Sequence, residues 1–207
     1  GAFTEANNKE HRVFATTPTL GDVTWLEYYH PYENIENVSI QISRVVHGYR
    51  NVFSAFDRNF GDSGGCNNNV NCPEGIPWEE EIRSAAMILT SGGFRVCSGA
   101  LVNNVRQDLT PYFLTANHCL GGESSWIIMF NYESPTCANE DGPTTDTVQG
   151  TTLLANYAPS DFALLLLQET PPESYNVHYA GWSAIETPPQ QPVGIHHPSG
   201  DIKKITF

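Results

Sequence analysis

Residues 112–119, which read YFLTANHC, decide the fold: a short apolar, β-prone run ends at Ala116 and leads at once into His118 and Cys119. Cys97 lies 22 positions before Cys119, and a disulfide between the two would tie the loop that carries His118 to a neighbouring strand. A general base needs such a fixed position, because proton transfer requires hydrogen-bond geometry before the pKa matters. The alternative is a structural histidine beside a disulfide.

A carboxylate at a strand start provides the second feature. Asp161 stands 43 positions after His118, directly before the apolar run FALLLL at 162–167. A carboxylate at the mouth of a buried strand is costly unless it is hydrogen-bonded, and an imidazole N–H is a suitable partner. Such a pair would lock the tautomer of the ring and stabilise the imidazolium that forms during catalysis. The alternative is a turn aspartate that caps the beginning of a strand.

Strand-like segments recur along the rest of the chain. They are short, apolar and bounded by turn residues, at 84–90, 94–97, 99–103, 112–116, 126–132 and 162–167. Nearer the N-terminus, residues 24–29 read as a strand, and residues 38–43 alternate apolar and polar side chains with a period of two. Because helical periods are few, the pattern predicts an all-β protein of the barrel or sandwich type.

The composition excludes two classes of partner. The chain has 10 Lys and Arg against 23 Asp and Glu, a formal charge of −13. Binding to nucleic acid phosphates needs a basic surface, and so does attraction to an anionic membrane. No apolar run approaches the about 20 residues that span a bilayer. We therefore expect neither nucleic acid nor a membrane as a partner.

The five cysteines, at positions 66, 72, 97, 119 and 137, lack the paired Cys-x-x-Cys spacing of a zinc ribbon. Together with the Lys-poor, Asn-rich composition, they are typical of disulfides in an oxidising compartment, so we expect a secreted protein. The odd number leaves one thiol, whose partner lies on another chain or outside the 207 residues. Five reduced, buried cysteines in a cytosolic protein are the alternative.

Several motifs, taken in their order and spacing, carry a resemblance to a known family. CSGALV at 97–102, LTANHC at 114–119 and SDFALL at 160–165 resemble the His and Asp motifs of trypsin-like serine proteases. The similarity is closer to the bacterial lysyl endopeptidase branch, through CN at 66–67, VNCPEG at 70–75, AGW at 180–182 and IHHP at 195–198. It covers residues 66–207 nearly continuously.

The resemblance implies a trypsin-like double β-barrel with the active site in the cleft between the barrels. His118 would be the general base and Asp161 the carboxylate that orients it. Disulfides would join Cys97 to Cys119 and Cys72 to Cys137, and Cys66 would pair with a cysteine beyond Phe207. We expect no cofactor.

The strand pattern, the composition and the same resemblance together suggest four segments. Residues 1–60 resemble the end of a pro-region, which is β-rich and part of a sandwich-like fold, and residues 61–65 form a linker. Residues 66–175 form the first β-barrel of a protease domain. Residues 176–207 supply the first strands of a second β-barrel, which is incomplete in this chain.

The motif GDSGG at 61–65 spells the nucleophile loop of trypsin-like enzymes, but its place in the chain argues against Ser63. Ser63 lies 55 positions before His118, whereas the nucleophile of this family comes from the second barrel, after the Asp. We treat Ser63 as a decoy in a linker and expect the nucleophile beyond Phe207. An active Ser63 in an unrelated fold stays open as an alternative.

A zinc site built from His118, His196 and His197 is a further alternative. No known metal-binding spacing supports it. Neighbouring residues of a strand also point to opposite faces, so His196 and His197 rarely bind one ion. We therefore predict no metal.

The resemblance implies a secreted serine endopeptidase that hydrolyses peptide bonds after Lys or Arg, by acyl transfer to a serine. Its partner would be a protein or peptide substrate, and the complete protein would be made as a zymogen and act as a monomer. The 207 residues alone are expected to be inactive, with apolar faces and open strand edges exposed. The alternative is a non-catalytic binding module on a protease-derived scaffold.

Overall fold

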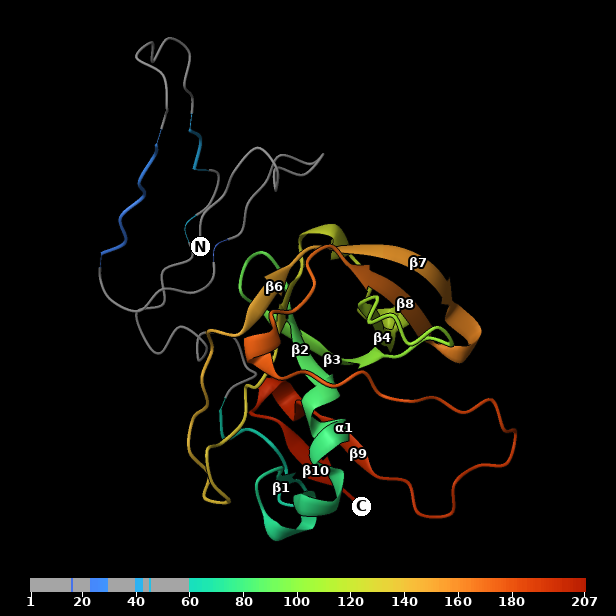
Figure 1. Cartoon of the computed structure of the whole chain (residues 1–207). Helices are drawn as coiled ribbons and strands as arrows, with labels where there is room; N and C mark the ends of the chain where they lie inside the picture. Colours follow the sequence, from blue (N-terminus) through green and yellow to red (C-terminus); the bar gives the residue numbers. More distant parts are fainter. Residues whose placement is uncertain (1–15, 17–22, 30–39, 43–44, 46–59) are drawn as a thin grey trace.

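A computed structural model describes residues 16, 23–29, 40–42, 45 and 60–207 of the chain (Figure 1). Most of the pro-region expected over residues 1–60 lies outside these residues. Residues 24–29 belong to no helix or strand, and the Trp25 side chain is 91% exposed, so the strand predicted there is wrong.

Seven antiparallel strands form the main sheet, in the order β6-β5-β2-β3-β4-β8-β7 (Figure 1). The strands are β2 (Ala85–Leu89), β3 (Arg95–Val102), β4 (Tyr112–Ala116), β5 (Ile127–Met129), β6 (Thr147–Gln149), β7 (Thr151–Tyr157) and β8 (Phe162–Leu167). The sheet curls into half of a barrel, so the predicted all-β fold class is confirmed.

The sequence pattern places some strands better than others. Strands β4 and β8 have the predicted bounds, because each is a short apolar run between clear turn residues. The segments expected at 94–97 and 99–103 are one continuous strand, β3, whereas β5 is shorter than the expected 126–132. Strand β7 was not predicted, since its sequence mixes apolar and polar residues without a regular period.

The core fills the inside of the curled sheet. In β8 the side chains of Ala163, Leu165 and Leu167 are at most 3% exposed, whereas Phe162 on the other face is 37% exposed. Phe113 and Trp126 pack with Leu165 and Leu167 in the largest buried cluster. Burial of one such side chain stabilises the fold by about 1.5–3 kcal/mol.

Strand β2 is buried on both faces. Ala86 and Ile88 belong to the largest buried cluster, whereas Met87 and Leu89 pack with Ile202 in a second cluster. The strand therefore lies between the interior of the half-barrel and the C-terminal part of the chain. This is why its sequence is a continuous apolar run rather than an alternating one.

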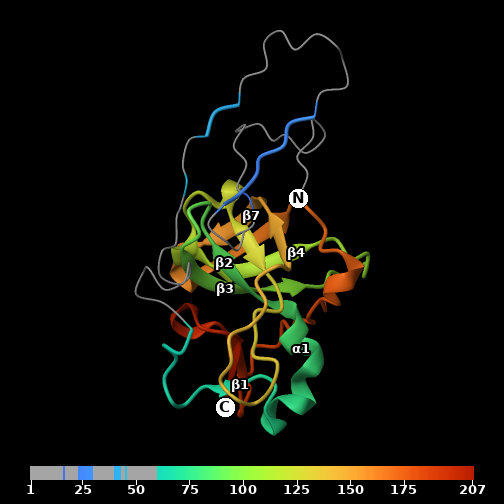
Figure 2. The same cartoon turned by 90° about the vertical axis from the view of Figure 1, so that its left-hand side faces the viewer.

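A smaller antiparallel sheet, in the order β1-β10-β9, lies below the main sheet in both views (Figures 1 and 2). Its strands are β1 (Asn68–Asn69), β9 (Gly194–His196) and β10 (Lys204–Thr206). The segment that follows Cys66 thus pairs with the last strand of the chain. Ile205 of β10 is buried and packs in a third cluster that includes Val70 and Ile82.

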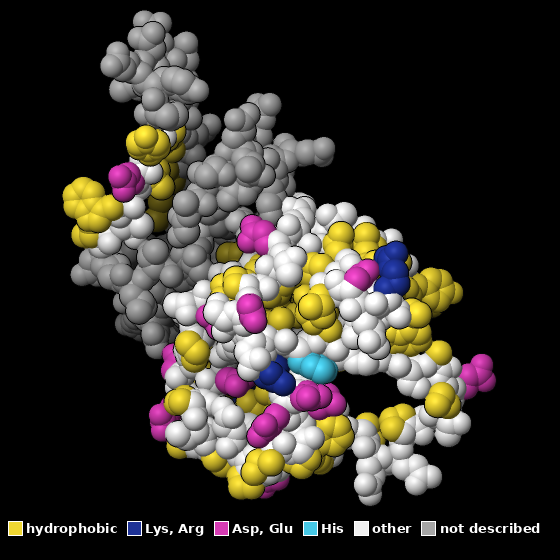
Figure 3. Space-filling view, in the orientation of Figure 1, with side chains coloured by type: hydrophobic (Ala, Val, Ile, Leu, Met, Phe, Trp, Pro, Cys, Tyr) yellow, Lys and Arg dark blue, Asp and Glu magenta, His cyan; other side chains and the backbone are white. Residues whose placement is uncertain are grey.

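The single α-helix, among the described residues, is α1 (Glu79–Ser84), which continues the 3-10 helix η2 (Pro73–Trp78). Residues 79–81, all glutamate, form the first turn of α1, where acidic side chains interact favourably with the helix dipole. Acidic side chains gather over this helix (Figure 3). Short 3-10 turns complete the fold: η3 (Asn117–Cys119), η4 (Glu123–Ser125), η5 (Ala158–Ser160), η6 (Glu173–Tyr175) and η7 (Pro198–Gly200). Across the described residues, no helix has the length and apolarity to cross a membrane.

Candidate active site

Two neighbouring strands bring His118 and Asp161 together. Strands β4 and β8 are antiparallel, and their pairing ends with Ala116 opposite Phe162. The residues directly after β4 therefore meet the residue directly before β8. His118 Nδ1 lies 2.6 Å from Asp161 Oδ2, and the His118 backbone N–H donates to Asp161 Oδ1 at 2.8 Å.

Asp161 joins the turn η5 to β8 in the left-handed region, at φ 55°. Aspartate tolerates this conformation better than most residues because its short polar side chain makes local hydrogen bonds. The hydrogen bond with the His118 ring, followed by that from the His118 backbone N–H, holds the pKa of the Asp161 carboxyl below its usual value. Because the carboxylate is thereby kept ionised, it can stabilise a positive charge on the imidazole.

The pair is open to solvent. The His118 side chain is 71% exposed and the Asp161 side chain is 48% exposed. A ring in this position is accessible to a second molecule or a second part of the protein. With its Nδ1 edge on the carboxylate, the imidazole can exchange a proton through Nε2.

A disulfide joins Cys119, the residue after His118, to Cys97 in β3, as the resemblance implied. Both sulfur atoms and one ring nitrogen of His118 lie within 4.8 Å of one another, a spacing that three metal ligands could share. Zinc and similar ions bind thiolates, however, and a disulfide supplies none. The disulfide thus acts on this site as a covalent tie between β3 and the turn that carries His118.

A further side chain at this site was missed by the sequence analysis. Asn156 of β7 pairs with Ala163 of β8, and its Nδ2 donates to Asn117 Oδ1 at 2.6 Å. Asn156 gave no signal of its own, since it could be placed beside Asn117 only once β7 was known to pair with β8.

Ser63 lies in a different set of contacts. Its backbone N–H donates to Asp201 Oδ2 at 3.2 Å, and the backbone N–H of Gly61 donates to Asp201 Oδ1 at 2.8 Å. Asp201 is fully buried, and its carboxylate lies 3.7 Å from Lys204 Nζ. Within residues 60–207, no hydrogen bond joins Ser63 to His118.

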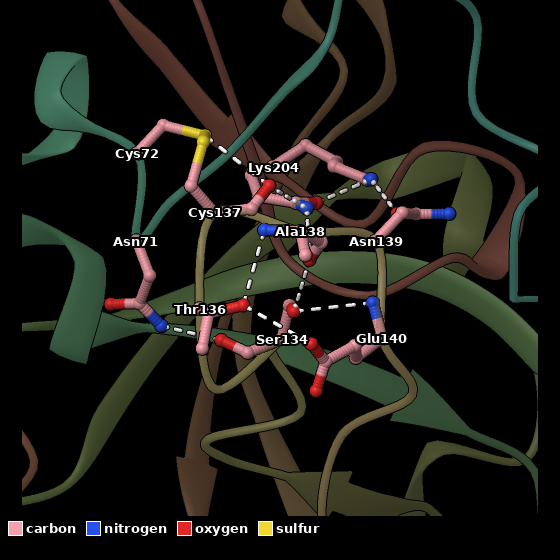
Figure 4. Close-up of a disulfide and its surroundings, with 10 residues drawn as sticks. Asn71, Cys72, Ser134, Thr136, Cys137, Ala138, Asn139, Glu140 and Lys204 are labelled. Carbon is pink, nitrogen blue, oxygen red and sulfur yellow. Dashed lines mark hydrogen bonds between the residues drawn. A yellow bond between two sulfur atoms is a disulfide. The ribbon is translucent and has the colours of Figure 1, made fainter.

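The second disulfide, Cys72–Cys137, is also present, and Figure 4 shows the polar loop around it. Asn71 Nδ2 donates to the carbonyl of Ser134 at 2.6 Å, and Lys204 Nζ donates to Asn139 Oδ1 at 2.9 Å (Figure 4). Together with the bonds from Asn69 Nδ2 to the carbonyls of Cys137 and Ala138, they hold the loop of residues 134–140 against β1 and β10. Cys66 is a free, exposed cysteine in this structure.

His196 and His197 are also placed by the structure. The ring of His197 is buried, stacks on Tyr132 at 6.1 Å between centroids, and hydrogen-bonds through Nδ1 to the carbonyl of Asp201 at 3.0 Å. Burial, reinforced by the charge of Lys203, holds the pKa of His197 well below its usual value. His196 is partly buried, and burial lowers its pKa as well.

Comparison with known proteins places the chain near a described family and a curated protein. The family model described as "Lysyl endopeptidase, C-terminal domain" matches residues 60–207. The lysyl endopeptidase of Pseudomonas aeruginosa is 32% identical over 162 residues, which cover 70% of this chain and 34% of the relative. The chain therefore spans about a third of the length of this curated relative.

Proposed function

The chain belongs to the lysyl endopeptidase family of trypsin-like proteases, and from this premise we propose that the protein is a secreted serine endopeptidase that cleaves after Lys or Arg. The observation that carries the proposal is the contact of 2.6 Å between His118 Nδ1 and Asp161 Oδ2. An imidazole held in this way has the geometry that a general base requires.

In the proposed reaction, Asp161 accepts a hydrogen bond from the Nδ1–H of His118 and remains ionised, so that Nε2 is unprotonated and takes the proton of a serine hydroxyl. The serine oxygen attacks the carbonyl carbon of the substrate, and His118 then returns the proton to the leaving amine. Asp161 stabilises the imidazolium between these two steps. Water releases the acyl group in a second round with the same base.

We propose that the nucleophilic serine lies outside these 207 residues. In support, the GDSGG motif uses the backbone of Gly61 and Ser63 to bind Asp201, and the Ser63 hydroxyl has no hydrogen bond within residues 60–207. A serine without a base within hydrogen-bond reach is a weak nucleophile. The proposal therefore expects no peptide hydrolysis from the 207 residues alone.

Secretion is supported by the two disulfides, which persist in oxidising compartments. The choice of Lys or Arg rests on the family and on the net charge of −13, which favours the approach of cationic peptides. Detection of the protein in the medium of its source organism, with both disulfides oxidised, tests the localisation. Retention of the protein inside the cell with reduced cysteines would contradict it.

The activity test uses the full-length protein and peptides that differ only in the residue before the scissile bond, with Lys, Arg or Ala there. We expect hydrolysis of the Lys or Arg peptides, inactivation by a serine-directed sulfonyl fluoride, and loss of turnover in His118→Ala. His178→Ala is the matched control, since the His178 backbone N–H binds the carbonyl of Arg83, away from Asp161.

Two results would overturn parts of this proposal. His118-dependent hydrolysis by the 207 residues alone would show that the nucleophile is among them. A full-length protein that binds peptides without cleaving them, and that the sulfonyl fluoride does not modify, would favour the binding module instead of the enzyme.

A further inference from the structure

The hairpin of β7 and β8 holds the turn that carries His118 from two sides. Its last pair is Tyr157 with Phe162, and η5 with Asp161 closes it. Asp161 binds the turn from the β8 end through the Asn117 backbone N–H at 3.0 Å and through His118. Asn156 binds it from β7 through the side chain of Asn117, at 2.6 Å.

This second contact is distinct from the others. Within residues 60–207, it is the only hydrogen bond between the 117–119 turn and β7. The remaining ties run to Asp161 at the β8 end of the hairpin and, through the disulfide of Cys119, to β3. Without Asn156, the turn could pivot about its contacts with Asp161 and Cys97.

Hydrogen bonds matter more here than in a packed site. Most of the His118 ring is exposed, and so is nearly half of the Asp161 side chain. Exposed side chains change rotamer within picoseconds to nanoseconds, so packing does not define the geometry of this pair. A catalytic group must nevertheless be held within about 0.5 Å of its productive position, which requires supporting hydrogen bonds.

We propose that Asn117 and Asn156 are positioning residues for the His118–Asp161 pair: their side-chain hydrogen bond fixes the 117–119 turn against β7, so that one hairpin sets both the carboxylate and the ring that it orients. The effect on turnover rests on the proposed function. The effect on the pair itself does not.

The first experiment measures the pair directly by NMR on the 207-residue chain. The Nδ1–H proton of His118 is expected to give a low-field signal, because it is hydrogen-bonded to Asp161, and its exchange with water reports how long the contact persists. We expect Asn156→Leu, which keeps the size of the side chain and removes its amide, to speed this exchange several-fold. Asn156→Gln, which keeps an amide donor, is expected to restore part of the protection.

The matched control is Asn104→Leu. Asn104 Nδ2 also donates to an exposed side chain at 2.6 Å, that of Asp108, in the loop at the opposite end of β4. Its replacement is expected to leave the Nδ1–H exchange of His118 unchanged. The variant Asn117→Ala combined with Asn156→Leu should behave like either single variant, because the two residues contribute one shared hydrogen bond.

The second experiment measures steady-state kinetics of the full-length protein. We expect Asn156→Leu to lower kcat about three- to tenfold, the range for loss of one hydrogen bond, with KM unchanged. Asn104→Leu should leave both constants unchanged. Unchanged exchange in Asn156→Leu, or an equal increase in Asn104→Leu, would overturn the inference. If the unsubstituted protein cleaves no peptide, the proposed function fails, and the exchange data still decide the role of Asn156.

Discussion

Gly99 in β3 offers a quantitative test of the fold that supports the site. A Cβ atom at this position would lie 2.3 Å from Cε1 and 2.6 Å from Cζ of Phe113, and 2.8 Å from the carbonyl oxygen of Leu114. Phe113 is fully buried, and the neighbouring residue Ala100 pairs with Leu114 across β3 and β4. The Gly99→Ala variant is therefore expected to be overpacked.

The magnitude follows from these distances. Carbon atoms pack at about 3.5–4.0 Å, so the ring of Phe113 must retreat by roughly 1 Å inside a filled core. Overpacking of this kind costs about 1–3 kcal/mol, and the upper end applies because the Leu114 carbonyl belongs to the sheet backbone. The lower entropy of alanine in the unfolded chain offsets about 0.4–1 kcal/mol. We expect a net loss of about 2 kcal/mol in the free energy of unfolding.

Urea unfolding of the 207-residue chain measures this loss. The control is Gly181→Ala, because a Cβ at Gly181 would meet no atom within 4 Å, so we expect only the entropic gain of about 0.4–1 kcal/mol. Gly99→Ala combined with Phe113→Leu should cost less than the sum of the two single changes, since the smaller side chain makes room for the added methyl. A Gly99→Ala variant as stable as Gly181→Ala would refute the packing argument.

Three further predictions concern the site and its covalent ties. Asp161→Asn in the full-length protein should lower kcat by about 10³–10⁴-fold, because an amide holds the imidazole in the wrong tautomer; steady-state kinetics checks this, and a loss below tenfold would contradict the role of the carboxylate. Replacing Cys72 and Cys137 by alanine should lower the free energy of unfolding by about 4 kcal/mol, and replacing Cys97 and Cys119 should lower it by about 3 kcal/mol. The first loss is larger because the two cysteines of that pair are 65 residues apart, against 22 in the second pair. Urea unfolding of both variants measures the losses, and the reverse order would argue against loop entropy as the cause. The pKa of Asp161 is lowered in the folded state, so its contribution to stability is present above the unfolded-state pKa and is lost as the pH falls through the folded-state pKa. Carbon-13 NMR of the Asp161 carboxyl should show titration below the usual range for aspartate. Titration at or above that range would contradict the contact with His118.

The strands next to the site could be predicted because their signals are local. Strands β4 and β8 are apolar runs between turn residues, and the residues at their ends, His118 and Asp161, are the types that a proton-transfer pair needs. Their contact follows from a single further fact, the antiparallel pairing of β4 with β8. Sequence motifs in a known order were sufficient to suggest that pairing.

Strand β1 and the contact between Asn156 and Asn117 depend on pairing between segments that are distant in the sequence, and local sequence patterns do not predict such pairing. Strand β1 has only two residues, both asparagine, and exists because β10, more than a hundred residues later, lies beside it. Asn156 contacts Asn117 because a register shift in the β7–β8 pairing sets Asn156 opposite Ala163. A bulge of this kind changes which side chains of β7 face the turn, and the residue types of β7 do not predict where the bulge lies.

The GDSGG motif is a case in which a local sequence pattern suggests a function that the fold does not support. Its glycines give the backbone enough freedom for the N–H groups of Gly61 and Ser63 to reach the two oxygens of one carboxylate, that of Asp201. A buried carboxylate requires such donors, so the motif has a structural use here that is independent of the Ser63 hydroxyl. A nucleophilic serine, in contrast, needs a base within hydrogen-bond reach. Whether a base lies there depends on which strand ends the fold brings together, and the GDSGG motif alone does not determine it. In this chain the strand ends that meet are those of β4 and β8, so a serine becomes a candidate nucleophile only if the fold delivers it to the exposed Nε2 edge of His118.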